Sequence, residues 1–361
     1  MNKTLLATTA LAFVAATASA VDVELYGQVN KGVFAFDDGA DTNFVVVDND
    51  MSSSRFGLKG AQALDNGLTA SVLYEAEMQG NPSNNFSKDF TAANNQVTDG
   101  AAATMTERQA RVGMSGNFGG VYVGRQSTAI DGVIGQDLAG VGDVMNSENS
   151  DIGGGIQFAT STGAASGVTV GGSTFGLPSR SNSVRYDSPI VAGFQGRAAI
   201  AQGGDMDASV FYEGGMNDFT VAAAAGVHMN NDSNQNVANR VDTEVAASVS
   251  AKHTSGIAGT VAYTTQSLGN KAAAVEEPSA WYAKVGYAWD AYEVAADYGV
   301  SKDYNNVGTR SDDLTTMGLG AQYNLGNGIS LAALYRNFDL DRTALTTEDV
   351  SLYGVNMRVK F

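Results

Sequence analysis

The sequence predicts an all-β protein, a transmembrane antiparallel β-barrel of about 16 strands whose third loop folds inward. Three observations carry this prediction. Apolar and polar side chains alternate in stretches of about ten residues, the connections are alternately short and long, and the N-terminus is typical of a secreted chain. Together they indicate a protein that crosses a membrane with strands.

The first 20 residues have the composition of a cleaved signal peptide. Lys3 supplies a positive charge, residues 5–16 are apolar, and Ala18-Ser19-Ala20 is a small-residue cleavage site. We therefore expect residues 1–20 to be removed and residues 21–361 to form one barrel domain. An uncleaved membrane anchor is the alternative, but the apolar stretch is shorter than the roughly 20 residues that a spanning helix needs.

The composition excludes several classes of protein. The 361 residues include 43 glycines and no cysteine, and 21 Lys and Arg against 38 Asp and Glu give a net charge of −17. Nucleic-acid binding would need a basic face. Without cysteine there are no disulfides or thiolate metal sites. His228 and His253 stand at no metal-binding spacing and no catalytic motif is present, so we expect neither enzymatic activity nor a cofactor.

Alternation is clearest near the C-terminus. Between residues 353 and 361 the odd positions are Tyr, Val, Met or Phe, and the even positions are Gly, Asn, Arg and Lys. Residues 280–290 and 328–336 alternate similarly, with aromatics such as Trp289 near the ends of the apolar face, as in a membrane girdle. A soluble sandwich also alternates, but it has no reason to alternate short and long connections.

The connections divide into two sets. Short turns that contain Gly, Asn, Asp or Pro are predicted at residues 64–67, 117–120, 188–189, 215–218, 254–256, 290–291 and 325–328. Longer polar loops are predicted at residues 37–51, 80–104, 127–180, 203–206, 229–241, 268–279, 303–313 and 340–348. These seven turns and eight loops imply about sixteen strands, enough to enclose water. The long third loop, residues 127–180, either rises outside or folds into the lumen.

Several segments resemble the general porins of Gram-negative bacteria. The matching residues are 54–60 (SRFGLKG) with 64–68 (LDNGL), 108–116 (RQARVGMSG) with 118–119 and 124–126, 182–189 (NSVRYDSP) with 193–194, Leu25-Tyr26-Gly27 and the terminal Phe361. The resemblance covers the whole mature chain. It departs from the family in the Gly- and Ser-rich stretch 153–180, which leaves the path of that part of the third loop open.

The resemblance implies a trimeric outer-membrane porin, a water-filled channel for passive diffusion of small hydrophilic solutes and ions. The third loop would form a constriction, and Phe361 would be the signal recognised by the barrel-assembly machinery. Periplasmic chaperones, outer-membrane lipids and lipopolysaccharide are the other expected partners. The alternative is a substrate-selective channel for sugars or anions, although no inward-facing row of aromatics is evident.

Strand parity selects candidates for the pore constriction. Where alternate apolar residues face lipid, their basic neighbours face the lumen, because Arg or Lys facing lipid at mid-membrane costs about 2–4 kcal/mol. The parity of Arg125 stays open, because its strand gives way there to the third loop. The predicted wall residues are Arg55, Lys59, Arg111, Arg125 and Arg185, and the predicted loop residues are Asp131, Asp137, Asp143, Glu148 and Asp151. A wet lumen tolerates charge anywhere, so each could instead be a solvated side chain.

Ion preference and ion binding are open on sequence grounds. The acidic loop favours cations and the arginine wall favours anions. We expect a weak cation preference, because salt screens charges beyond about 10 Å and the loop acids stand nearest the constriction. Asp37, Asp38 and Asp41 of the first outer loop could bind Ca²⁺ or another divalent ion, although EF-hand spacing is absent.

Overall fold

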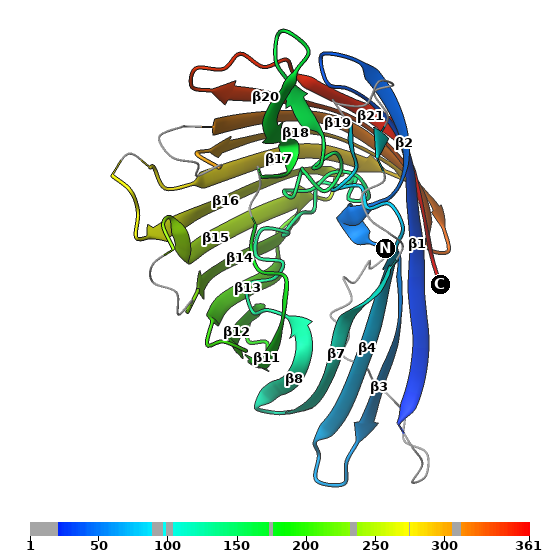
Figure 1. Cartoon of the computed structure of the whole chain (residues 1–361). Helices are drawn as coiled ribbons and strands as arrows, with labels where there is room; N and C mark the ends of the chain where they lie inside the picture. Colours follow the sequence, from blue (N-terminus) through cyan, green and yellow to red (C-terminus); the bar gives the residue numbers. More distant parts are fainter. Residues whose placement is uncertain are drawn as a thin grey trace.

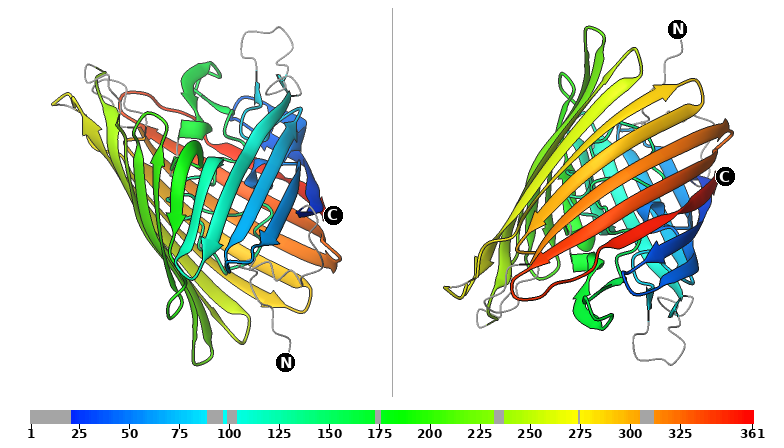
Figure 2. Two further views of the ribbon diagram at one scale, coloured as in Figure 1. Left: turned by 90° about the horizontal axis from the view of Figure 1, so that it is seen from below. Right: turned by 90° about the horizontal axis from the view of Figure 1, so that it is seen from above.

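The computed structural model describes residues 21–88, 97–98, 104–172, 176–231, 237–273, 275–304 and 312–361. The expected signal peptide, residues 1–20, lies outside these ranges. The described chain forms a closed antiparallel barrel with loop segments inside it (Figure 1). Its strands are strongly tilted, as the two views in Figure 2 show. In this part of the chain no helix is long and apolar enough to cross a membrane.

The barrel wall is built from long strands, each paired with its neighbours in chain order. They are β1 (Asp22–Asp37), β2 (Thr42–Asp48), β3 (Arg55–Ala63), β4 (Thr69–Gln79), β7 (Thr104–Gly116), β8 (Gly119–Ser127), β11 (Arg180–Asp187), β12 (Phe194–Ala201), β13 (Met206–Met216), β14 (Phe219–Met229), β15 (Arg240–His253), β16 (Ile257–Gly269), β17 (Ser279–Trp289), β18 (Tyr292–Lys302), β19 (Asp312–Gly326), β20 (Ile329–Arg342) and β21 (Val350–Lys360). The loops contain β5 (Ser87–Lys88), β6 (Val97–Thr98), β9 (Gln157–Ala159), β10 (Ala165–Thr169) and the 3-10 turns η1 (Asp50–Ser52) and η2 (Val170–Gly172).

Strands β2 and β3 together form one stave of the wall, that is, one strand position in the barrel. Residues 22–28 of β1 pair with β3, whereas residues 31–37 of β1 pair with β2. The other edge of β1 pairs with β21, from Gln28 opposite Lys360 to Asp37 opposite Ser351, and this closes the barrel. Because β2 and β3 share one side of β1, the 17 strands of the sheet make sixteen staves. The predicted strand number is confirmed.

The short connections lie where the sequence predicts them. Asn217, Asp290 and Asn327 adopt positive φ values of 53°, 48° and 51° in three of these turns, a conformation that Asn and Asp tolerate better than other side chains. The first predicted loop, residues 37–51, is wrong in its extent because it contains strand β2. Val45 and Val47 of that strand pack inside, so an apolar alternation is hidden between acidic residues.

The outer face of the barrel is apolar, and aromatics lie on it toward both ends of the strands, as with Trp281 and Tyr298 near the long loops. Tyr287, Trp289, Tyr292 and Tyr323 form a continuous stack, with ring centroids 5.3, 5.7 and 4.8 Å apart. The predicted aromatic girdle is therefore present on strands β17 to β19. Exposed residues such as Val355 on β21 continue the apolar face to the C-terminus.

The third loop, of which the structure describes residues 128–172 and 176–179, folds into the lumen over residues 128–156 (Figure 1). Strands β9 and β10 then form a hairpin beside the last outer loop, where the backbone N–H of Glu348 donates to the carbonyl oxygen of Ala159 at 2.9 Å. Val141, Val144 and Met145 pack onto inward-facing apolar residues of β1, β2 and β18 to β21. Ile130, Val133 and Ile134 pack onto inward-facing alanines of β14 to β17. Gly286 on β17 leaves room for the loop backbone, because a Cβ there would collide with the carbonyl oxygen of Ala139. One side of the inner wall is thus a platform for the loop.

Candidate pore lining

Buried cations hold the third loop on this platform. Lys284 on β17 donates to Asp137 Oδ2 at 2.7 Å, to the carbonyl oxygen of Met145 at 2.9 Å and to that of Gly140. Arg336 on β20 pairs with Asp297 and donates to the carbonyl oxygen of Asn149 at 2.9 Å. The side chains of Lys284 and Arg336 are fully buried. Both cations are therefore paired within the protein and serve to position the third loop.

Two of the predicted constriction acids belong to this anchoring system. Asp137 accepts from Lys284 and from Thr260 Oγ1, the latter at 2.6 Å. Asp143 is completely buried and pairs with Arg358 on β21 and Ser330 on β20. The structure therefore places both acids between loop and wall rather than on the open side of the loop. Their positions follow from the opposite charges on the wall, which the loop sequence alone does not reveal.

Arginines and acids line the opposite wall at the level of the loop. Arg108 Nε lies 2.7 Å from Glu75 Oε1, and Arg108 Nη1 lies 2.6 Å from Glu77 Oε2. Arg55 Nε lies 3.5 Å from Glu75 Oε2. Arg180, the first residue of β11, is in electrostatic range of Glu75, Glu77 and the loop residue Asp131. We call Arg55, Arg108, Arg180, Glu75 and Glu77 the balanced tier.

Arg108 reaches the lumen through a β-bulge. Glu75 of β4 pairs with Gln109 of β7, and the next residue, Ala76, pairs with Glu107, so Arg108 is the extra residue. Strict alternation from the inward-facing Arg111 would put Arg108 on the outer face. The bulge reverses the parity beyond it. Sequence reasoning missed Arg108 for this reason, and it missed Glu75 and Glu77 because only basic wall residues were sought.

Of the remaining loop acids, Asp131 and Glu148 face Arg180 of the balanced tier. The Glu148 side chain is exposed to the lumen, but the protein that surrounds it displaces much of its water, and this desolvation and the charge of Asp131 raise its pKa, while Arg180 acts in the opposite direction. Burial and the charges of Glu148 and Asp50 raise the pKa of Asp151 well above its usual range. Asp131, Glu148 and Asp151 thus form one interacting group, and their place at the pore constriction stays a prediction.

The turn η1 adds an acid that the sequence assigned to the outer loop. Residues 49–52 bend into the lumen, where Asn49 Nδ2 donates to the carbonyl oxygen of Asp143 at 2.8 Å. Burial and the charge of Glu77 raise the pKa of Asp50 to about 6, against the effects of Gln79, Asn84 and Arg108. Asp50 is therefore a pore residue with a titration near neutral pH.

A second group of arginines lies nearer the short turns. Arg111, Arg185 and Arg197 project inward from β7, β11 and β12. The guanidinium carbons of Arg111 and Arg185 lie 4.3 and 5.7 Å from the ring centroid of Tyr122. That of Arg197 lies 3.9 Å from the ring centroid of Phe211. We call these three arginines the basic tier; Arg111 and Arg185 are predicted wall residues, and Arg197 is an addition.

The other two predicted wall residues lie elsewhere. Lys59 faces inward near the short-turn end, where its Nζ lies 3.1 Å from Glu24 Oε1. Arg125 shares the parity of Val121 and Val123, which are exposed on the outer face. Its Nε donates to the carbonyl oxygen of Glu107 at 2.9 Å. The structure thus places Arg125 outside the lumen, and this corrects its predicted position.

The acidic tip of the first loop holds a lysine. Lys88 Nζ lies 3.1 Å from Asp38 Oδ2 and 3.1 Å from Asp41 Oδ2. Asp38 Oδ1 also accepts from the backbone N–H of Ala40 at 3.0 Å. Within the described ranges, no group of three or more His, Asp or Glu side chains is arranged to hold a metal ion.

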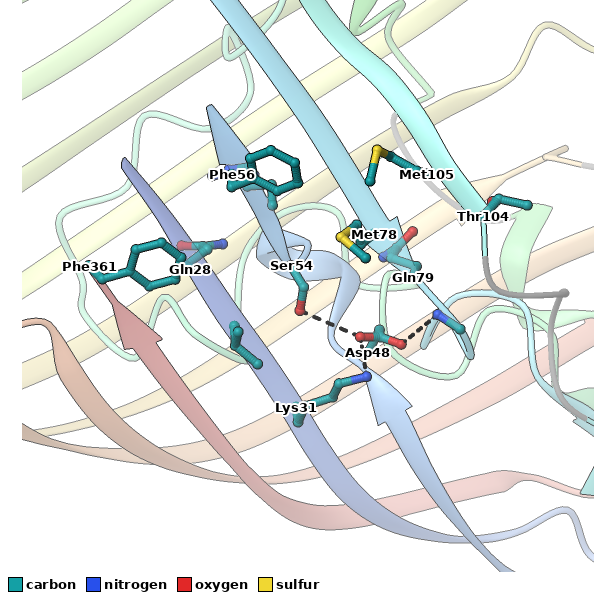
Figure 3. Close-up of a pocket in the computed structure, with 13 residues that line it drawn as sticks. Gln28, Lys31, Asp48, Ser54, Phe56, Met78, Gln79, Thr104, Met105 and Phe361 are labelled. Carbon is teal, nitrogen blue, oxygen red and sulfur yellow. Dashed lines mark hydrogen bonds and ion pairs between the residues drawn. The ribbon is translucent and has the colours of Figure 1, made fainter. Parts of the chain in front are cut away.

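A groove of about 590 Å³ opens on the outer face between β1, β3, β4 and β7 (Figure 3). Phe56, Met78, Met105 and Phe361 form its apolar lining, and Lys31 pairs with Asp48 at its side. The backbone N–H of Phe361 donates to the carbonyl oxygen of Gly27 at 3.0 Å, so the C-terminal residue sits on the seam of the barrel. The predicted role of Phe361 in assembly stays a prediction.

A closed sixteen-stave barrel with an apolar exterior, a charged lumen and an inward loop has the architecture of outer-membrane channel proteins. A family model described as "Gram-negative porin" matches residues 7–343. The chain belongs to this family, and it is a protein of the outer membrane.

Individual relatives agree with this assignment. Over 204 residues the chain is 29% identical to the major outer membrane protein P.IB of Neisseria sicca, an alignment that covers 55% of this chain and 46% of that protein. The chain therefore spans about half the length of the curated relative that it matches. The anion-selective porin from Comamonas acidovorans superposes with a TM-score of 0.62 at 16% identity, covering 94% of this chain and 100% of that one. The in-vitro folded trimer form of OmpT from Vibrio cholerae gives 0.57 at 16% identity, covering 95% and 100%.

Proposed function

We propose that the protein is a water-filled channel for passive diffusion of small hydrophilic solutes and ions. One observation carries the proposal: at the level of the third loop, the inner wall presents the balanced tier to the acids Asp131 and Glu148. Charges of both signs on facing surfaces create a field across the lumen. Such a field orients dipolar solutes and disfavours apolar ones.

Reconstitution into planar bilayers tests the channel function. Purified protein is expected to produce stepwise conductance increments, and liposomes that contain it should swell in small sugars but not in large oligosaccharides. Heat-denatured protein is the control for both measurements. An absence of conductance steps from protein whose barrel fold is verified by circular dichroism would refute the proposal.

We expect a weak preference for cations that weakens on acidification. As pH falls through about 6, Asp50 binds a proton and one negative charge leaves the pore. Glu148 and Asp151, whose pKa values are also raised, change in the same direction. The reversal potential in a KCl gradient should therefore move toward the chloride potential between pH 7.5 and 5. The D50N variant should show a smaller shift, and a pH-independent reversal potential would contradict this expectation.

We further infer that the chain forms homotrimers through the outer face of β1, β7 and β8. Lys31, Glu107 and Arg125 interrupt the apolar exterior there, at a cost of about 2–4 kcal/mol for Arg or Lys exposed to lipid at mid-membrane. Lys31 already pairs with Asp48 within the chain, and contact with another copy would give Glu107 and Arg125 charged partners. The groove of Figure 3 lies on the same face, and OmpT of Vibrio cholerae has a trimer form.

Charge reversal on this face tests the inferred interface. E107K places two cations side by side, because Arg125 Nε already contacts the Glu107 backbone. The trimer should therefore dissociate at a lower temperature in semi-native electrophoresis. D339K, an equal charge change on the outer face of β20, is the matched control. Equal dissociation temperatures for E107K and the parent chain would contradict this interface.

A further inference from the structure

We propose that the basic tier of Arg111, Arg185 and Arg197 is a binding subsite for oxyanions that carry a phosphate group. The inference rests on the proposed channel function and names a class of solute for one level of the lumen. The subsite lies on the short-turn side of the balanced tier. Arg111 stands three residues along β7 from Arg108, which is about 10 Å in an extended strand.

Aromatic rings hold the three guanidinium groups in place. Tyr122 of β8 lies opposite Arg185 in the sheet register, and it carries the guanidinium groups of Arg111 and Arg185 on its ring. Phe211 of β13 supports Arg197 at 3.9 Å. Stacked guanidinium groups lose little freedom when they bind a ligand, because their planar forks are already oriented.

The basic tier has more positive than negative charge. Its one acid, Asp187, is engaged by Arg185, whose Nε and Nη2 donate to the two carboxylate oxygens at 2.8 and 2.9 Å. Arg197 donates from Nε and Nη2 to Gln195 Oε1, a neutral acceptor, at 3.1 and 3.0 Å. The balanced tier differs in this respect, because Arg55 and Arg108 there pair with carboxylates.

Arg111 is the least satisfied cation of the group. Its Nε and Nη1 have no hydrogen-bond partner among the described residues. Neither Arg111 nor Arg197 forms an ion pair in that part of the chain. Asp131 reaches Arg197 only through longer-range electrostatics from the loop.

The chemistry favours a phosphate group as the occupant. A guanidinium group binds tetrahedral oxyanions through two parallel N–H donors. Arg111 is the member of the basic tier whose donors lack partners, and Arg185, which shares the Tyr122 ring with it, and Arg197 add positive charge. The acids Asp131 and Glu148 of the third loop face the balanced tier and repel an anion that enters from the loop side. A phosphate that enters from the short-turn side meets the basic tier first.

Single-channel recording with inorganic phosphate tests the subsite. Because the chain has no cysteine, a D65C substitution in the turn between β3 and β4 allows an impermeant thiol reagent to report the orientation of each inserted channel. Phosphate added on the short-turn side is expected to reduce the current reversibly, and at lower concentration than phosphate added on the loop side.

Three variants separate a built subsite from general electrostatics. R111Q/R197Q should raise the half-blocking phosphate concentration at least about tenfold, as expected for the loss of charge-assisted hydrogen bonds. R111K/R197K keeps the charge and removes the planar forks, so it should weaken phosphate block while the chloride-to-potassium permeability ratio stays unchanged. K302Q removes an exposed cation at the end of β18, outside the lumen and outside the inferred trimer interface, and should behave like the parent channel.

The outcomes distinguish this inference from the proposed function. Equal phosphate block in the parent and in R111Q/R197Q, or no block in the parent at millimolar phosphate, overturns the subsite and leaves the channel function intact. Full retention of block in R111K/R197K also overturns it, because the effect would then depend on charge alone. An absence of conductance in verified, folded parent protein refutes the channel itself.

Discussion

Replacement of Lys284 by methionine is expected to release the third loop from the wall. The Lys284 side chain is fully buried, and its ammonium group serves Asp137 and two loop carbonyl oxygens. Removal of one partner from a buried ion pair costs about 3–5 kcal/mol, because the other charge is left without compensation. The loop should then sample positions away from β17. Single-channel recording should show a higher and noisier conductance, and liposome swelling should admit larger sugars.

A second substitution and a control sharpen this prediction. K284M/D137N removes the uncompensated carboxylate, so its conductance should lie closer to the parental value and its current noise should be lower than in K284M. K302M removes an exposed lysine at the end of β18 and should leave the channel unchanged. If K284M shows parental conductance and parental noise, the apolar contacts of the loop suffice to hold it and the role assigned to Lys284 is wrong.

Neutralisation of the three open-side acids is expected to give the largest change in ion preference. In D131N/E148Q/D151N the arginines of the balanced tier lose their facing charges, so the reversal potential in a KCl gradient should move toward the chloride value. A cation about 4 Å from a carboxylate in water gains about 1 kcal/mol, so each charge changes the permeability ratio up to about fivefold. The recording should be made at pH 8, where Glu148 and Asp151, whose pKa values are raised, carry more negative charge.

Position within the lumen, rather than net charge, should decide this result. E276Q/E277Q/D290N makes the same change in total charge at exposed positions in a long loop and a short turn between strands. These charges lie outside the lumen and are screened by salt within about 10 Å. The control variant should keep the parental reversal potential. If both triple variants shift it equally, the third loop does not set ion preference.

Much of the fold could be predicted from local chemistry. The alternation in residues 353–361 and the Gly- and Asn-containing turns specify strands, their faces and their number, because side-chain direction in a strand alternates whatever the rest of the chain does. Strand β2 escaped prediction because its short apolar run is bordered by Asp41 and Asp48. Asp48 ends this strand and is not part of an open acidic loop. It accepts from the backbone N–H of Gly80 at 2.9 Å and pairs with Lys31.

The candidate site could be predicted only in part. Parity correctly places Arg55, Arg111 and Arg185 on the inner face, because strand geometry settles that question locally. It misses Arg108, since a single extra residue in β7 reverses the alternation beyond it. Arg125 lies near the end of β8 and on the outer face. The alternation with Val121 and Val123 predicts that face only if β8 is known to continue as far as Arg125.

The sequence by itself determined the barrel, its strand number, the inward or outward face of most wall residues and the presence of a long acidic loop. All of these depend on spacing along the chain. Only the tertiary structure decided what the loop acids do. Asp137 and Asp143 meet Lys284 and Arg358 on the wall against which the loop packs, whereas Glu148 and Asp151 do not form ion pairs in the described part of the chain. The physical reason is that a carboxylate's role depends on which charge lies within a few ångströms, and for this loop those charges come from strands more than 100 residues away.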